Sequence, residues 1–98
     1  MSIKLTKAEV QALELLLSQL IKFEHVDMGD KLLICILTAF YKKLVIKLLD
    51  IKPRYSIKMD EQTELAFFVY FDGEDCNPTN FTDNLVKKIS DNIQKKYA

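Results

Sequence analysis

The feature that most constrains the fold of this chain is the apolar run at residues 64–71, Glu-Leu-Ala-Phe-Phe-Val-Tyr-Phe. We expect a β-strand here. Successive side chains of a strand point to opposite faces of its sheet, so this strand would be apolar on both faces. Such a strand needs cover on both sides, from other parts of the chain or from another molecule.

The two faces of this expected strand have different candidate partners. One face can pack on helices, and it would consist of Leu65, Phe67, Val69 and Phe71. The other face would carry Ala66, Phe68 and Tyr70, and each aromatic side chain there has about 150 to 250 Å² of surface to bury. An exposed area of this order matches the largest apolar patch of an ordinary monomer, about 300 to 600 Å². We therefore expect Ala66, Phe68 and Tyr70 to form an interface, in a homodimer or with another protein. The alternative is that helices of the same chain cover both faces.

The size of the chain sets its domain organisation. With 98 residues, 49% of them hydrophobic, and only two glycines and two prolines, residues 1–98 should form one domain. A domain of this size buries only about 60 to 65% of the surface that its unfolded chain exposes. Association between subunits is therefore a plausible supplement to its stability.

Three helices are expected from their capping residues and from apolar residues at three- and four-residue spacing. Thr6 and Glu9 fit a capping box, which begins a helix that runs to about Glu24. Asp27 is a candidate cap for a helix at residues 28–49, and Asn80 for the last helix. The first half of the middle helix has no polar face, so the rest of the domain or another subunit must surround it.

A strand is expected at residues 55–59, where apolar and polar residues alternate. The polar residues 60–63 would connect it to the strand at residues 64–71 in a hairpin. The expected order of elements is α-α-β-β-α. The sequence thus predicts a small α+β domain with a central apolar helix and a two-stranded antiparallel hairpin packed on helices.

The residues that could carry chemistry are few and scattered. His25 is the only histidine, and the two cysteines, Cys35 and Cys76, are far apart in the sequence. Cys35 should behave as a small buried hydrophobe, while Cys76 lies in an acidic loop at residues 72–80 whose task the sequence does not reveal. The glycines Gly29 and Gly73 cannot supply a phosphate-binding loop. We expect no metal, no cofactor and no catalytic residue, and hence a non-catalytic interaction or accessory protein.

The charges balance, with 14 basic and 14 acidic side chains, so net charge does not point to nucleic acid or to a membrane. Nucleic-acid binding is nevertheless kept as an alternative, because lysines recur on two expected helices: Lys42, Lys43, Lys47, Lys87 and Lys88. No apolar stretch reaches the roughly 20 residues of a membrane span. With no sign of a disulfide framework or a signal peptide, the expected location is the cytoplasm.

Overall fold

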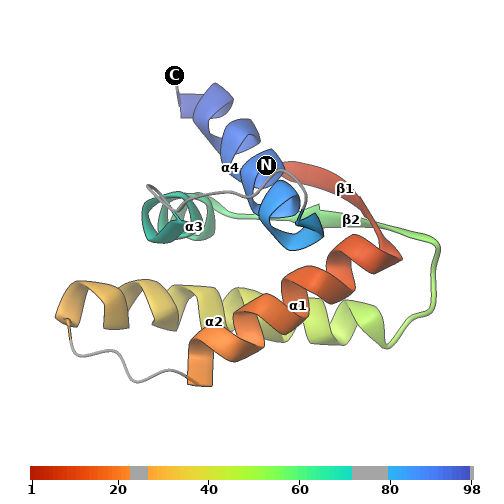
Figure 1. Ribbon diagram of the computed structural model, residues 1–98, viewed down its shortest axis with the longest axis horizontal. Helices are drawn as coiled ribbons and strands as arrows, with labels where there is room; N and C mark the ends of the chain where they lie inside the picture. The colour runs from red at the N-terminus through yellow and green to blue at the C-terminus, as the bar shows by residue number, and fades with distance from the viewer. Residues whose placement is uncertain (23–26, 72–79, 98) are drawn as a thin grey trace.

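The computed structural model describes residues 1–22, 27–71 and 80–97, which form two strands and four helices (Figure 1). In chain order these elements are β1 (Ser2–Thr6), α1 (Lys7–Lys22), α2 (Met28–Leu48), β2 (Arg54–Lys58), α3 (Glu61–Phe71) and α4 (Phe81–Tyr97). Helices α1 and α2 form one layer, and the strands lie over it together with α3 and α4 (Figure 1). The prediction of a small α+β domain is confirmed, although the order of elements is β-α-α-β-α-α.

The two strands pair antiparallel, with Ile3 opposite Ile57 and Leu5 opposite Tyr55. These four side chains are buried, while the residues between them point to solvent. The alternating strand predicted at residues 55–59 is therefore confirmed within one residue. Its predicted partner is wrong, because β2 pairs with the start of the chain and not with residues 64–71.

Residues 64–71 belong to helix α3, so the prediction of a strand there is wrong. The carboxylate of Asp60 accepts the backbone N–H of Thr63 at 2.8 Å, and the carbonyl of Asp60 accepts the N–H of Glu64 at 2.9 Å. These are the bonds of a capped first helical turn. Because side chains of a helix repeat every 3.6 residues rather than alternating, Leu65 and Val69 face solvent and are 43% and 58% exposed.

The capping residues expected for the other helices are found at their ends. Thr6 and Glu9 form the capping box at the start of α1, where each side chain accepts the other residue's backbone N–H, at 3.2 and 2.9 Å. The side chain of Asn80 accepts the N–H groups of Thr82 and Asp83 at 2.9 and 3.1 Å. Asp27 occupies the N-cap of α2 but makes no side-chain capping bond.

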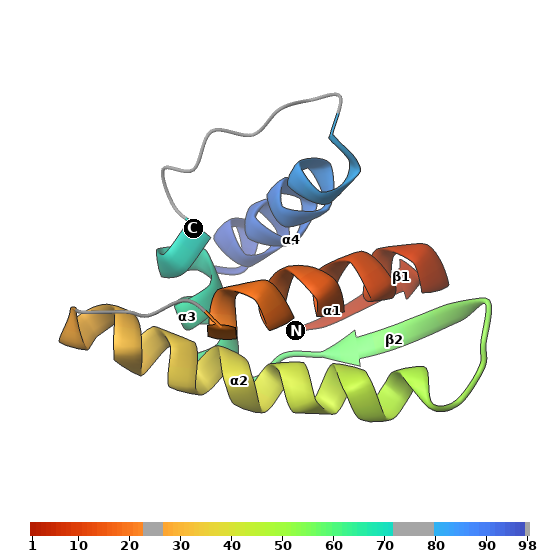
Figure 2. The same cartoon turned by 60° about the horizontal axis from the view of Figure 1, so that its bottom comes forward.

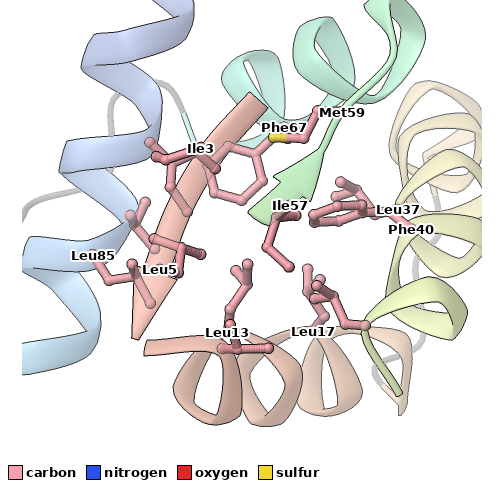
Figure 3. Packing of buried hydrophobic residues seen from close by; sticks show 14 of the residues in the cluster. Ile3, Leu5, Leu13, Leu17, Leu37, Phe40, Ile57, Met59, Phe67 and Leu85 are labelled. Atoms are coloured by element: carbon pink, nitrogen blue, oxygen red, sulfur yellow. The ribbon is translucent and has the colours of Figure 1, made fainter. Parts of the chain in front are cut away.

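The core lies between the two layers (Figure 3). Both strands and all four helices contribute side chains to it, including Ile3, Leu5, Leu13, Leu17, Leu37, Phe40, Ile57, Met59, Phe67 and Leu85. Helix α1 lies between α2 and α4 and contacts both (Figure 2). Helix α2 therefore lies at the side of the molecule, with one face toward the core and the other away from it.

Candidate protein interaction surface

Helix α2 has an apolar inner face that packs into the domain. Ile34, Leu37, Phe40 and Leu44 are all at least 91% buried. The sequence predicted a helix that is apolar all round and that must be surrounded. The domain surrounds only this inner face. Whether another molecule covers the opposite face of α2 stays a prediction.

The opposite side of α2 carries exposed apolar residues in a regular row. They recur at alternating spacings of four and three residues, with Lys42 occupying one position of the same series. Met28, Leu32 and Ile46 are 76%, 63% and 66% exposed. We call this row the outer stripe and define it as Met28, Leu32, Cys35, Ala39 and Ile46. The alternation of four and three residues is the spacing of the a and d positions in a helix that pairs with another helix.

The outer stripe is long enough for a helix to lie along it. From Met28 to Ile46 it covers about 27 Å at the rise of 1.5 Å per residue of an α-helix. Two small residues, Cys35 and Ala39, lie near its middle and both are exposed. Small side chains at this position allow the backbone of a second helix to approach closely.

The exposure of Cys35 corrects a prediction made from the sequence. We expected Cys35 to be a buried hydrophobe, because its neighbours in the chain are apolar. The structure places it on the outer face of α2 as a free thiol. Its neighbours Ile34 and Leu37 are turned toward the core, and one step along a helix rotates a side chain by about 100°.

From residue 31 onward, the charged residues of α2 beside the outer stripe are all positive. Every charged residue of α2 from residue 31 onward is a lysine, and the helix begins with Asp27 at its cap and Asp30 in its first turn. Lys42 occupies one position of the row itself, while Lys31 lies along one flank of the stripe and Lys43 along the other, as the helical repeat requires. All three lysines are exposed. The stripe is therefore an apolar strip within a positive border.

The three residues predicted as an interface are held largely within the chain. Ala66 is 98% buried, and both Phe68 and Tyr70 are partly buried against the core. A helix does not place these residues on one face as a strand would. Phe68 also lines a cavity of about 370 Å³ between α3 and α4, together with Leu65 and Ile93.

The lysines considered for nucleic-acid binding are divided between two sides of the molecule. Lys42, Lys43 and Lys47 lie on α2, whereas Lys87 and Lys88 lie on α4, with α1 between the two helices (Figure 2). Lys88 is also 3.3 Å from Glu9 in an ion pair. The structure therefore does not bring these five lysines into one continuous basic surface.

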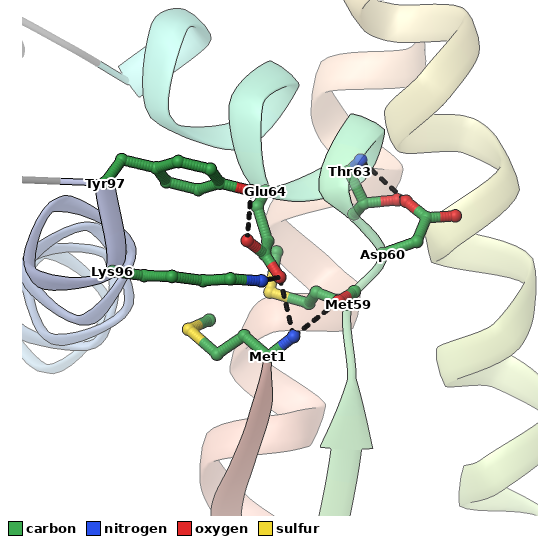
Figure 4. A network of polar contacts seen from close by, with 7 residues as sticks. All are labelled: Met1, Met59, Asp60, Thr63, Glu64, Lys96 and Tyr97. Carbon is green, nitrogen blue, oxygen red and sulfur yellow. Dashed lines mark hydrogen bonds and ion pairs between the residues drawn. The ribbon is translucent and has the colours of Figure 1, made fainter.

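A buried carboxylate that sequence analysis did not single out is Glu64 of α3, which lies in a network of polar contacts (Figure 4). Glu64 is fully buried and accepts hydrogen bonds from the amino group of Met1 at 2.6 Å, the ammonium of Lys96 at 3.0 Å and the hydroxyl of Tyr97 at 2.8 Å. Burial alone raises the pKa of Glu64, but these three donors outweigh it and hold the pKa below its ordinary value. Every oxygen of this carboxylate has a partner, so we regard it as a structural link between β1, α3 and α4.

The remaining residues that could carry chemistry give no second site. His25, Cys76 and most of the acidic loop at residues 72–80 lie outside the described residues. Among the described ones, no three histidine, cysteine or acidic side chains are grouped as metal ligands. None of the helices in the described ranges is long and apolar enough to cross a membrane.

Comparison with other proteins adds no relative to this description. The chain matches no family model, no curated protein and no solved structure.

Proposed function

We propose that this protein is a non-catalytic interaction module that binds a helix of another protein along the outer stripe of α2. The single observation that carries the proposal is the exposure of five apolar or small residues at coiled-coil spacing on one helix face. Water is excluded from the inner face of α2 by the domain, but the outer stripe has no such cover among the described residues. A helix that lies in this row of side chains would provide it.

The border of lysines supports a specific chemistry for the partner. An amphipathic helix with apolar residues along its centre and glutamate or aspartate along its edges would match both the stripe and its charges. Complementary charges across an interface favour association and suppress incorrect partners. The proposed partner is therefore a helix with an acidic border.

The same charges argue against a second copy of this chain as the occupant. A parallel pair of α2 helices would place Lys42 beside Lys42. An antiparallel pair that aligns the two stripes would place Lys31 of one copy near Lys42 of the other. Either arrangement sets like charges together at the edge of an apolar interface, which is unfavourable. Self-association, which the sequence predicted through residues 64–71, is thus the competing outcome.

A designed peptide tests the proposal without an identified partner. The probe is a labelled helical peptide with leucine at its a and d positions and glutamate at the flanking positions. Its control has lysine in place of glutamate. Binding is measured by fluorescence anisotropy. We expect only the acidic peptide to bind, and Leu32→Glu to weaken its binding at least about tenfold.

A matched control variant separates the outer stripe from general surface hydrophobicity. Leu15 on α1 is 56% exposed, close to the 63% of Leu32, but it lies outside the stripe. Leu15→Glu should change the affinity by less than about twofold. Equal loss in both variants, or equal binding of the acidic and basic peptides, would contradict the proposal.

Light scattering over a range of protein concentrations distinguishes a separate helical partner from self-association through the outer stripe. A monomer at every concentration agrees with a separate partner. A dimer that Leu32→Glu converts to a monomer would instead show that the stripe is used between copies, and would overturn the acidic partner.

We place this function in the cytoplasm. Its reducing conditions would keep the exposed Cys35 as a thiol within the stripe.

Nucleic-acid binding stays an alternative prediction. Its signature would be retention of DNA or RNA at low salt and steep loss of affinity as salt is added.

A further inference from the structure

The second strand has a free edge on the side away from β1. Met59 and Met1 exchange backbone hydrogen bonds of 2.8 and 2.9 Å, and Lys7 donates to the carbonyl of Pro53 at 3.2 Å. In an antiparallel ladder, alternate residues turn their N–H and C=O groups toward the partner strand. The residues between them, 54, 56 and 58, therefore direct these groups to the outer edge. No other described strand pairs there.

One group along this edge already has a partner within the chain. The ammonium of Lys47, on α2, donates to the carbonyl of Ser56 at 2.7 Å. Both residues are exposed, so water can replace this bond at little cost. The contact shows that the edge of β2 faces the side of α2 and that the carbonyl of Ser56 is accessible to a donor.

Two cavities follow this edge and share Lys47 as a common wall. The first, about 280 Å³, has an apolar lining of Phe40, Leu44, Ile46 and Ile57, and Lys43 and Lys58 also line it. The second, about 320 Å³, is polar and is lined by Asp50, Lys52, Arg54 and Ser56 among others. Together they form a groove between the C-terminal half of α2 and the free edge of β2, which we call the edge groove.

The edge groove has a clear excess of positive charge. Its lining residues include five cations, which are Lys43, Lys47, Lys52, Arg54 and Lys58. Among the described residues of the lining the only acid is Asp50, whose carboxylate is 3.1 Å from the ammonium of Lys52. Asp60 is a further acid nearby, since the charge of Lys43 is one of the causes that lower the pKa of Asp60, after its hydrogen bonds to Thr63. Four cations remain without an acidic partner in the lining.

From this geometry we infer that the edge groove binds an extended acidic peptide segment of a partner protein, which adds to β2 as a third strand. The peptide backbone would bond the free N–H and C=O groups of residues 54, 56 and 58. One apolar side chain would enter the first cavity, and acidic side chains would meet Lys43, Lys58 and Arg54. Main-chain bonds supply affinity in this mode of binding, and the pockets and charges supply specificity.

A second copy of the chain fits this groove poorly. The edge of another β2 would bring Arg54 and Lys58 against the same two cations. The free edge of β1 carries Lys4, which is also exposed. Positive charge on exposed edges is a common protection against pairing between copies. An acidic strand avoids that repulsion, which is why we assign the groove to a different protein.

The two surfaces meet at Lys43 and Ile46, which border or belong to the outer stripe and also line the first cavity. They can still be tested separately, because Leu32 belongs only to the stripe and Lys58 only to the groove. The outer stripe offers side chains only, whereas the edge groove offers backbone groups of β2. Leu32→Glu should leave binding of an extended peptide within about twofold of wild type. Lys58→Glu should likewise leave binding of the helical peptide within about twofold. Failure of one proposal is therefore distinguishable from failure of the other.

Backbone hydrogen exchange provides the decisive test. The probe is a synthetic peptide of alternating glutamate and valine, and its control carries N-methyl groups on alternate amides so that it cannot form a strand ladder. We expect the peptide to slow exchange of the amides of residues 56 and 58 at least about tenfold, and the methylated peptide to have no such effect. Binding without protection of these amides would overturn the inference.

Charge variants test the groove in a second way. Lys58→Glu and Arg54→Glu should each weaken binding of the peptide about tenfold. Lys4→Glu is the matched control on the neighbouring strand, with the same change of charge, and should weaken binding less than about threefold. Equal effects of all three would indicate nonspecific attraction to a positive surface and would contradict the edge groove.

Laurate, an amphipathic anion, is tested separately. If it alone bound the first cavity while the peptide did not, the groove would be a small-molecule site.

Discussion

Among single residues, Glu64 combines complete burial with a full set of hydrogen-bond donors. Its three donors come from Met1, which directly precedes β1, and from α4, so one carboxylate on α3 joins residues that are 63, 32 and 33 positions away in the sequence. A buried charge that loses its partners is strongly destabilising, because its desolvation is no longer offset. The residues of this cluster could not be predicted as a group, since only the fold brings Met1, Glu64 and Tyr97 together.

Replacement of Glu64 tests its structural role. Glu64→Gln keeps the shape of the side chain but removes the charge that the two ammonium groups require. We expect the free energy of unfolding to fall by about 1 to 3 kcal/mol, as measured by urea denaturation. Glu61→Gln is the control, because Glu61 lies on the same helix and is exposed. Equal effects of the two variants would exclude a special role for Glu64.

The difference in the free energy of unfolding between wild type and Glu64→Gln should depend on pH, because the pKa of Glu64 is lowered in the folded state. Its ordinary value is 4.5, and the folded state holds it lower. A carboxyl group whose pKa is lower in the folded state stabilises the fold above its unfolded pKa. This contribution is lost as the pH falls through the folded pKa. We therefore expect the gap in stability between wild type and Glu64→Gln to be constant near neutral pH and to narrow below about pH 4.5. A gap that widened on acidification would contradict this assignment.

At the scale of elements, local signals predicted helix ends and one strand but not the state of residues 64–71. The capping box at Thr6 and Glu9 and the cap at Asn80 depend on neighbours in the chain, so they could be recognised in the sequence. Residues 61–71 are rich in apolar side chains on every side, so their pattern fits a strand or a helix. The Asp60 cap was the available signal for a helix. Strand β1 also had a signal, the alternation of Ile3 and Leu5 with polar residues, which was overlooked beside the helix that follows.

The cap at Asp60 gives a prediction for α3. Asp60→Ala removes the acceptor of the Thr63 N–H and should lower the free energy of unfolding by about 0.5 to 2 kcal/mol. Asp60→Asn retains a capping oxygen and should recover most of that loss. Denaturation of the three proteins under the same conditions provides the comparison. Similar losses in both variants would mean that the charge of Asp60, and not its capping bond, stabilises this turn.

The two faces of α2 give a further prediction at this scale. Leu37 is fully buried and Leu32 is 63% exposed, although both are leucines of the same helix. Leu37→Ala should destabilise the domain by about 2 to 5 kcal/mol, because it leaves a cavity in the core. Leu32→Ala should change stability by less than about 0.5 kcal/mol. Comparable losses at both positions would show that the outer stripe is covered in the isolated protein.

For the whole molecule, the sequence predicted that a partner would cover apolar surface on a strand at residues 64–71. The structure shows helix α3 there, so the strand is wrong, while an interface at these residues stays a prediction. In α3, Ala66 and Phe67 are buried whereas Leu65 and Val69 are exposed, and the regular exposed apolar row lies on α2. The composition of α2 was recognised as apolar all round, yet which side the domain would cover depends on how α1 and the strands pack. This packing involves segments that are distant in the sequence, so the residues of α2 alone do not determine it. The edge groove could not be predicted for the same reason, since it needs the pairing of β2 with β1 rather than with its neighbour in the chain.

The pairing of β1 with β2 has a consequence for how the chain reaches this fold. Met1 and Met59, which are bonded at the end of the sheet, are 58 residues apart, and α1 and α2 fill the interval. Closing so long a loop carries an entropic penalty that the α1–α2 hairpin can reduce by forming first. The sheet should then be absent from the rate-limiting transition state. Stopped-flow measurements on Ile3→Val should show faster unfolding with an almost unchanged refolding rate. The first residues of the chain would then form their native contacts last during folding and lose them first during unfolding.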